Sequence, residues 1–224
     1  MIVQRPHTPH DLESELVDDF PLTRLGEHDC LVQKEVDLDR IARAVREILV
    51  AVGEDPDREG LLETPQRVAR AYREMFGGLK ESAAGHLGRV FHEPNADDLV
   101  IVRDIAFHSV CEHHLATISG VAHIAYLPAG GRVVGLSKLA RTLEVYARRP
   151  QVQERLTNQV ADAIDDHLAP LGVAIVIEAD HYCMKQRGVK SPCSNTITVA
   201  FRGIYRDDRE ARAEVLGLMN SPRR

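Results

Sequence analysis

Two short segments of the sequence hold cysteine and histidine at spacings that suit a metal ion. Cys111 and His114 are three residues apart, so a turn or a helix start can aim both side chains at one point. His181 and Cys183 alternate at the end of an expected strand, so we expect them to project to the same side of it. Thiolate sulfur combined with imidazole suits zinc better than magnesium or calcium, which prefer oxygen ligands.

The number of ligands decides what such a site can do. With His113, the two segments offer two thiolates and three imidazoles, and the spacing leaves open whether His113 or His181 completes the set. A structural zinc site fills all four positions with protein ligands, whereas a catalytic site keeps one position for water. Both readings stay open, as do unmetallated packing and a thiol hydrolase in which His113 activates Cys111. The sequence lacks the H-x-E signature of zinc deaminases and the H-E-x-x-H signature of zincins.

Two helix starts carry groups that could hold an anionic, nitrogen-rich ligand. Ser137, Lys138 and Arg141 lie in the first turns of an expected helix, where the backbone and the basic side chains favour a phosphate. They are also consistent with an ordinary solvated helix start. Glu154, at the start of the next helix, could accept two hydrogen bonds from an amidine-like edge such as that of guanine, or could be exposed charge. Arg187 closely follows the second cysteine and histidine segment, so it could add positive charge beside a metal.

The surrounding pattern predicts an α+β fold. Helical periodicity behind an Asp37 N-cap predicts a first helix that ends near Gly53, and Thr64 with Pro65 starts a second. After these we expect strands 99–107 and 118–127, helices 137–147 and 151–168, strands 173–179 and 196–201, and a helix at 207–219. The chain would then have three parts: an acidic, mobile or extended leader at 1–36, a helical region at 37–96 and a catalytic α+β domain at 97–224.

Composition narrows the class of protein. The chain has 224 residues and a net charge of −6, and residues 1–40 hold 10 acidic against 4 basic side chains. The remainder is balanced, so we expect no basic face for nucleic acid. No apolar stretch approaches the roughly 20 residues of a membrane span, and the N-terminus lacks secretory features, so we expect a cytoplasmic protein without membrane partners. Cys30 and Cys193 lie outside the two segments and are expected to be free thiols.

Four segments, in this order, resemble the GTP cyclohydrolase I family. They are Cys-Glu-His-His at 111–114, Gly-Leu-Ser-Lys at 135–138, Arg-Pro-Gln-Val-Gln-Glu-Arg-Leu-Thr at 149–157, and His-Tyr-Cys-Met at 181–184 followed by Arg-Gly-Val at 187–189. The resemblance spans about residues 37–205. It implies the tunnelling fold, an antiparallel ββααββ sheet with helices on one face, behind an N-terminal helical extension. It also implies a homo-oligomer, a decamer with active sites between subunits.

The resemblance implies a role for each candidate residue. Zn²⁺ would be held by Cys111, His114 and Cys183, while His113 would give a proton to the imidazole of GTP during hydrolysis at C8. His181 would assist proton transfer or hold the ribose. Formate would leave, and rearrangement and ring closure would give 7,8-dihydroneopterin triphosphate. The substrate contacts would be Ser137, Lys138, Arg141, Gln153, Glu154, Arg187 and, from another subunit, Arg67.

Two other functions stay open on the same residues. One is a paralogue of the same fold that acts in deazapurine or other pterin metabolism. The other is a noncatalytic, zinc-stabilised module that binds a nucleotide. Formation of product from GTP would separate GTP hydrolysis from both of these alternatives.

Overall fold

A computed structural model describes residues 35–222, so nearly all of the predicted acidic leader, with Cys30, lies outside the described residues. None of the helices in this part of the chain has the length and apolarity that crossing a membrane requires. In chain order the elements are α1 (Leu38–Ala51), α2 (Thr64–Met75), η2 (Gly77–Lys80), α3 (Ala84–Leu87), β1 (Val90–His92), β2 (Val100–Cys111), β3 (Thr117–Leu127), β4 (Arg132–Val134), α4 (Leu136–Ala147), β5 (Pro150–Gln151), α5 (Gln153–Leu168), β6 (Gly172–His181), α6 (Tyr182–Lys185), β7 (Thr196–Gly203), α7 (Ile204–Asp207) and α8 (Arg209–Met219).

The main sheet has five strands in the order β5-β2-β3-β6-β7. β2 pairs with β3, β3 with β6, and β6 with β7, all antiparallel. The short β5 pairs in parallel with the end of β2, and β1 and β4 form a separate antiparallel pair. Because α4 and α5 come between β3 and β6 in the chain, the order of the long elements is ββααββ, as expected for the tunnelling fold. The α+β prediction is confirmed.

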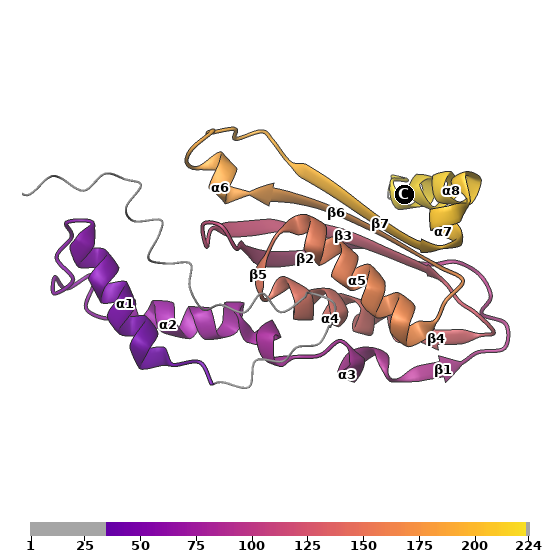
Figure 1. Ribbon diagram of the computed structural model, residues 1–224, viewed down its shortest axis with the longest axis horizontal. Helices are drawn as coiled ribbons and strands as arrows, with labels where there is room; N and C mark the ends of the chain where they lie inside the picture. The colour runs from indigo at the N-terminus through magenta and orange to yellow at the C-terminus, as the bar shows by residue number, and fades with distance from the viewer. Residues whose placement is uncertain (1–34, 223–224) are drawn as a thin grey trace, which may run out of the picture. The chain divides into compact units, whose positions relative to one another are not determined.

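Strand alternation gives the sheet two different apolar faces. Ile124 and Ile175 belong to the larger core, which includes the buried sides of α4 and α5. Their neighbours Ala125 and Ala174 belong to a second core that includes Val215 of α8. Figure 1 shows α4 and α5 together on one side of the sheet. The predicted placement of helices on one face therefore holds for these two, and α8 covers part of the opposite face.

Local sequence signals set the starts of α1 and α2. The carboxylate of Asp37 accepts a hydrogen bond from the backbone N–H of Arg40 at 2.8 Å, which caps α1 as predicted. Pro65 lies in the first turn of α2, where a backbone N–H has no acceptor within the helix, so the lack of one in proline costs no hydrogen bond. The helix expected at 137–147 begins one residue earlier, because α4 starts at Leu136 with Gly135 as its N-cap. Ser137 lies inside the first turn.

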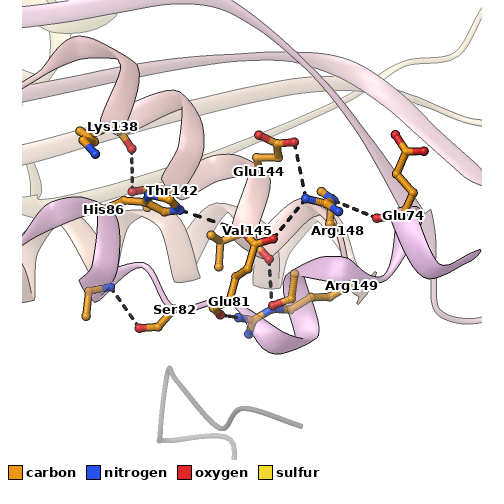
Figure 2. Close-up of polar contacts among 12 residues, drawn as sticks. Glu74, Glu81, Ser82, His86, Lys138, Thr142, Glu144, Val145, Arg148 and Arg149 are labelled. Carbon is orange, nitrogen blue, oxygen red and sulfur yellow. Dashed lines mark hydrogen bonds and ion pairs between the residues drawn. The ribbon is translucent and has the colours of Figure 1, made fainter. Parts of the chain in front are cut away.

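Two arginines at the end of α4 fasten it to the last turn of α2 and to the segment that follows (Figure 2). Arg148 donates from Nε to the backbone oxygen of Glu74 at 2.9 Å and from a terminal nitrogen to the Glu81 carboxylate at 3.2 Å. Arg149 donates to the backbone oxygens of Gly78 at 3.0 Å and Glu81 at 2.9 Å. A Cβ at Gly78 would lie 2.1 Å from a backbone oxygen of α4. We call residues 74–81 with 148–149 the arginine clasp; it fixes where α4 ends.

Candidate metal centre

Three of the predicted ligands meet at one end of the main sheet. Cys111 ends β2, His114 lies in the turn before β3, and Cys183 lies in α6, directly after β6. One donor atom from each residue lies within 4.8 Å of the other two. Cys111 is buried, Cys183 is partly buried and His114 is exposed. The cluster is therefore anchored in the core on one side and open to solvent on the other.

Backbone hydrogen bonds in a tight turn position the first two ligands. The N–H of Cys111 donates to Ala116 and the N–H of Leu115 donates to Cys111, each at 2.8 Å. Leu115 has a φ of 51°, a left-handed conformation that non-glycine residues rarely adopt. The chain thus reverses within one turn, and Cys111 and His114 point to a common place, as their three-residue spacing predicts.

The second segment is arranged differently from the expectation. His181 and Cys183 do not share a face, because β6 ends at His181 and α6 begins at Tyr182. Alternation holds only within a strand, so the helical turn brings Cys183 to the cluster. The ring of His181 instead meets the side chain of Gln153, with 2.7 Å between Nε2 and Oε1. The prediction that the two residues project to the same side is therefore wrong.

The donor set fits a zinc ion. Burial, together with the adjacent Cys111 thiol, raises the pKa of the Cys183 thiol, and a cation between the two sulfurs would offset both effects. Arg187 lies 3.1 Å from Nε2 of His114, and because a guanidinium only donates, this ring nitrogen carries a lone pair that a metal could take in place of Arg187. Two sulfurs and one neutral imidazole are the protein ligands of one known kind of catalytic zinc site, which keeps a fourth position for another ligand.

The two other histidines stay outside the cluster. The side chain of His113 is 64% exposed, and its Nε2 lies 3.9 Å from the Glu112 carboxylate. His181 is partly buried, and burial is the main cause that lowers its pKa below the ordinary value, against the opposing charges of Glu154 and Asp180. Both imidazoles therefore lie beside the cluster without being among the residues that could hold its metal.

An ion pair that was not predicted from the sequence supports the turn that holds Cys111 and His114. Arg155, in α5, donates two hydrogen bonds to the Glu112 carboxylate, at 2.7 and 2.9 Å. These bonds hold the pKa of Glu112 below its ordinary value. The N–H of Glu112 also donates to the backbone oxygen of Gln151 at 3.0 Å. The only hint in the sequence was that both partners lie in family motifs, since 43 residues separate them.

The predicted substrate contacts fall into separate places. Arg187 contacts His114, and the charge of Glu154 acts on His181, so both lie at the cluster end of the sheet. Gln153 is buried against His181. Arg67 lies in α2, where it pairs with Glu63 at 2.7 Å and both side chains are exposed.

The remaining three candidates lie in the first turns of α4. Among residues 35–222, no hydrogen bond or ion pair engages the side-chain nitrogens of Lys138 or Arg141. The other end of α4 is near the cluster, since Ser109 donates to the backbone oxygen of Ala147 at 2.7 Å. Ten residues of helix between Ser137 and Ala147 correspond to about 15 Å. The structure therefore does not bring this group to the metal centre of the same chain.

The fold and the donor set define an α+β protein with a candidate catalytic metal centre. Residues 41–220 match the model of the family described as GTP cyclohydrolase I, and the chain belongs to that family. It is 56% identical to GTP cyclohydrolase 1 of Caldanaerobacter subterraneus subsp. tengcongensis over 84% of this chain and 100% of the relative. It is 61% identical to the Rhodopirellula baltica protein of that name, over 83% and 80% of the two chains, and 56% identical to the Bacillus subtilis one, over 82% and 96%.

Proposed function

We propose that this protein hydrolyses the imidazole ring of GTP at C8, releases formate and forms 7,8-dihydroneopterin triphosphate, the first step of folate and pterin biosynthesis. The observation that carries the proposal is the cluster of two thiols and one imidazole, with His113 and His181 beside it but outside it. Membership of the GTP cyclohydrolase I family supports it, as do relatives named GTP cyclohydrolase 1 that match most of this chain.

In this proposal Cys111, His114 and Cys183 hold Zn²⁺. When bound by three protein ligands, zinc would lower the pKa of a water in the fourth position to about 7, which would supply a nucleophile near neutral pH. Since burial and Cys111 raise the pKa of Cys183, its thiol must lose a proton when it binds the metal. Zinc affinity is therefore expected to fall as the pH falls.

The chain's own groups handle protons and recognition. His113 is exposed beside the cluster and gives a proton to the imidazole nitrogen of GTP as the ring opens, a role that imidazole fills well near neutral pH. His181, whose pKa is lowered by burial, is neutral and accepts a proton. Glu154 takes two hydrogen bonds from the N1 and N2 edge of guanine, and Arg187 neutralises part of the triphosphate.

We also propose a homodecamer in the cytoplasm, with active sites between subunits. Ser137, Lys138 and Arg141 of one copy would hold the ribose and triphosphate at the metal centre of its neighbour, and Arg67 would come from another copy. The support is the length of α4 together with the basic side chains in its first turns, which have no partner among the described residues. A phosphate group bound there would be stabilised by the basic side chains and by the N-terminus of α4.

The test is to incubate the zinc-loaded full chain with GTP. We expect formate and, after oxidation, a fluorescent pterin. His113→Ala should keep zinc and lose turnover by about 100-fold or more, whereas His92→Ala, in β1 and exposed, is the matched control. GTP binding without either product would contradict the proposal and favour a nucleotide-binding module. Turnover of dihydroneopterin triphosphate in place of GTP would indicate a paralogue.

A further inference from the structure

The side chain of Gln153, at the start of α5, is in direct contact with one of the proposed proton carriers. Gln153 has a relative exposure of 1%, and its Oε1 lies 2.7 Å from Nε2 of His181. We propose that Gln153 is a positioning residue, which fixes the proton of His181 on Nε2 and leaves Nδ1 as the nitrogen that accepts. The catalytic consequence rests on the proposed GTP hydrolysis, whereas the placement of the proton does not.

The orientation of the Gln153 amide follows from its partners. Its nitrogen donates to the backbone oxygens of Ile177 at 3.1 Å and Thr196 at 2.9 Å. Carbonyl oxygens only accept, so a reversed amide would place oxygen against oxygen twice. The hydroxyl oxygen of Thr198 lies 3.1 Å from the same nitrogen and can share one of its two hydrogens. The atom that faces His181 is therefore the amide oxygen.

This orientation determines which ring nitrogen of His181 carries the proton. An amide oxygen only accepts, so the ring nitrogen opposite it must donate. A neutral imidazole has one N–H and one lone pair, and a proton held on Nε2 leaves the lone pair on Nδ1. Since Gln153 is buried, water does not compete for its oxygen. His181 thus presents one defined tautomer before any ligand arrives.

Two threonines hold Gln153 in this place. The hydroxyl of Thr157 donates to the backbone oxygen of Gln153 at 2.7 Å and lies 2.6 Å from the hydroxyl of Thr198. These contacts join α5 to β7, which flanks the β6 strand that ends in His181. The amide of Gln153 therefore acts on His181 and on the backbone.

The placement of the proton is tested by nuclear magnetic resonance on zinc-loaded full chain with ¹⁵N-labelled histidine. Spectra that correlate ring nitrogens with ring C–H protons distinguish the two tautomers, and the His181 signals are assigned by their loss in His181→Gln. We expect the wild-type protein to show Nε2–H alone. A signal for Nδ1–H, or a mixture, would overturn the inference whether or not the protein hydrolyses GTP.

The role in turnover is tested with Gln153→Met, which keeps a similar volume but removes the acceptor. We expect a mixture of tautomers, a fall in kcat of about 10- to 100-fold, and little change in zinc content or in KM for GTP. Gln151→Met is the matched control, because Gln151 is equally buried and donates to Tyr146 and Gln159 but does not contact His181.

The two variants separate positioning from packing. Equal loss of kcat in both, or an unchanged tautomer in Gln153→Met, would contradict the positioning role. If Gln153→Met does not fold, the wild-type spectrum still decides where the proton lies. A wild-type chain that shows Nε2–H but yields no product from GTP would contradict the proposed function and leave this assignment standing.

Discussion

Two regions that are expected to serve the same substrate are built in different ways. Beside the metal cluster two polar side chains are held by partners: Arg155 holds Glu112, and Gln153 holds His181. In the first turns of α4, the basic side chains have no hydrogen-bond or ion-pair partner within residues 35–222. The first region is tied to α5 through partly or fully buried side chains, whereas Ser137 and Arg141 are exposed.

This difference corresponds to two roles: chemistry at the metal cluster, and substrate binding in the first turns of α4. Groups that must hold a metal or a proton at one place benefit from partners that fix them in advance. Groups that meet a highly charged ligand can remain solvated until it arrives and then exchange water for phosphate oxygens. Changes near the cluster should therefore act on turnover, and changes in the first turns of α4 should act on affinity.

The largest effect is expected from Cys111→Ser. Loss of a proposed metal ligand should weaken zinc binding by more than about 100-fold, since loss of an outer partner alone costs 10- to 100-fold, and turnover should disappear with it. The matched control is Cys193→Ser, because Cys193 is exposed and lies outside the cluster. Metal content is measured by elemental analysis and turnover by formate release. Equal zinc content in the two variants would refute the proposed site.

Gly78→Ala should break the arginine clasp. The new Cβ would lie 2.1 Å from the backbone oxygen of Val145, and forced overpacking of this kind costs about 1–3 kcal/mol of unfolding free energy. Gly85→Ala is the control, since a Cβ there meets nothing within 4 Å. Denaturant unfolding measures both variants. If α4 depends on the clasp for its position, the KM for GTP should rise more than kcat falls.

Lys138→Ala should affect binding alone. Because no partner holds the Lys138 ammonium among the described residues, the unfolding free energy should change by less than about 0.5 kcal/mol. The KM for GTP should rise about tenfold, as one charged hydrogen bond to phosphate is lost. Arg43→Ala, on the exposed side of α1, serves as the control. A fall in kcat with unchanged KM would contradict the expectation that the first turns of α4 act on affinity and not on turnover.

The smallest effect is expected from Glu112→Gln, at about 1 kcal/mol of unfolding free energy at pH 7. The hydrogen bonds from Arg155 lower the pKa of Glu112 from its ordinary 4.5. This stabilisation is therefore complete above pH 4.5 and is lost as the pH falls through the lowered value. Wild type and variant should converge in acid, as followed by denaturant unfolding at several pH values.

Glu63→Gln is the matched control for this ion pair. Its partner Arg67 is 63% exposed and Glu63 is 72% exposed, so the pair should contribute less than about 0.5 kcal/mol at any pH. A larger effect at Glu63 than at Glu112 would contradict the view that the turn beside the cluster is held more firmly than the surface.

Local signals in the sequence predict most of this fold. A capping Asp37, a Pro65 in the first helical turn and branched residues along β2 and β3 each act through neighbours in the chain. The same holds for Cys111 and His114, because one turn is enough to bring them together. What local pattern could not show is the point at which β6 becomes α6, which separates His181 from Cys183.

The sequence also could not predict contacts between residues that are distant in the chain. Glu112 and Arg155 are 43 residues apart, and the oxygen of Gln153 finds His181 only because α5 packs across β6 and β7 (Figure 1). Hydrogen bonds of this kind depend on tertiary packing and have no spacing rule. The ligand set and the substrate contacts came from the family resemblance, and the roles of individual residues remain predictions.

The length of α4 has a consequence for mixtures of chains. If each active site draws its metal ligands from one copy and its basic residues from the next, a Cys111→Ser chain and a Lys138→Ala chain carry their defects in different halves of a site. Refolding the two together should then create some sites in which both halves are intact. Two preparations that are each impaired would complement one another, and activity would return on mixing without any change of sequence.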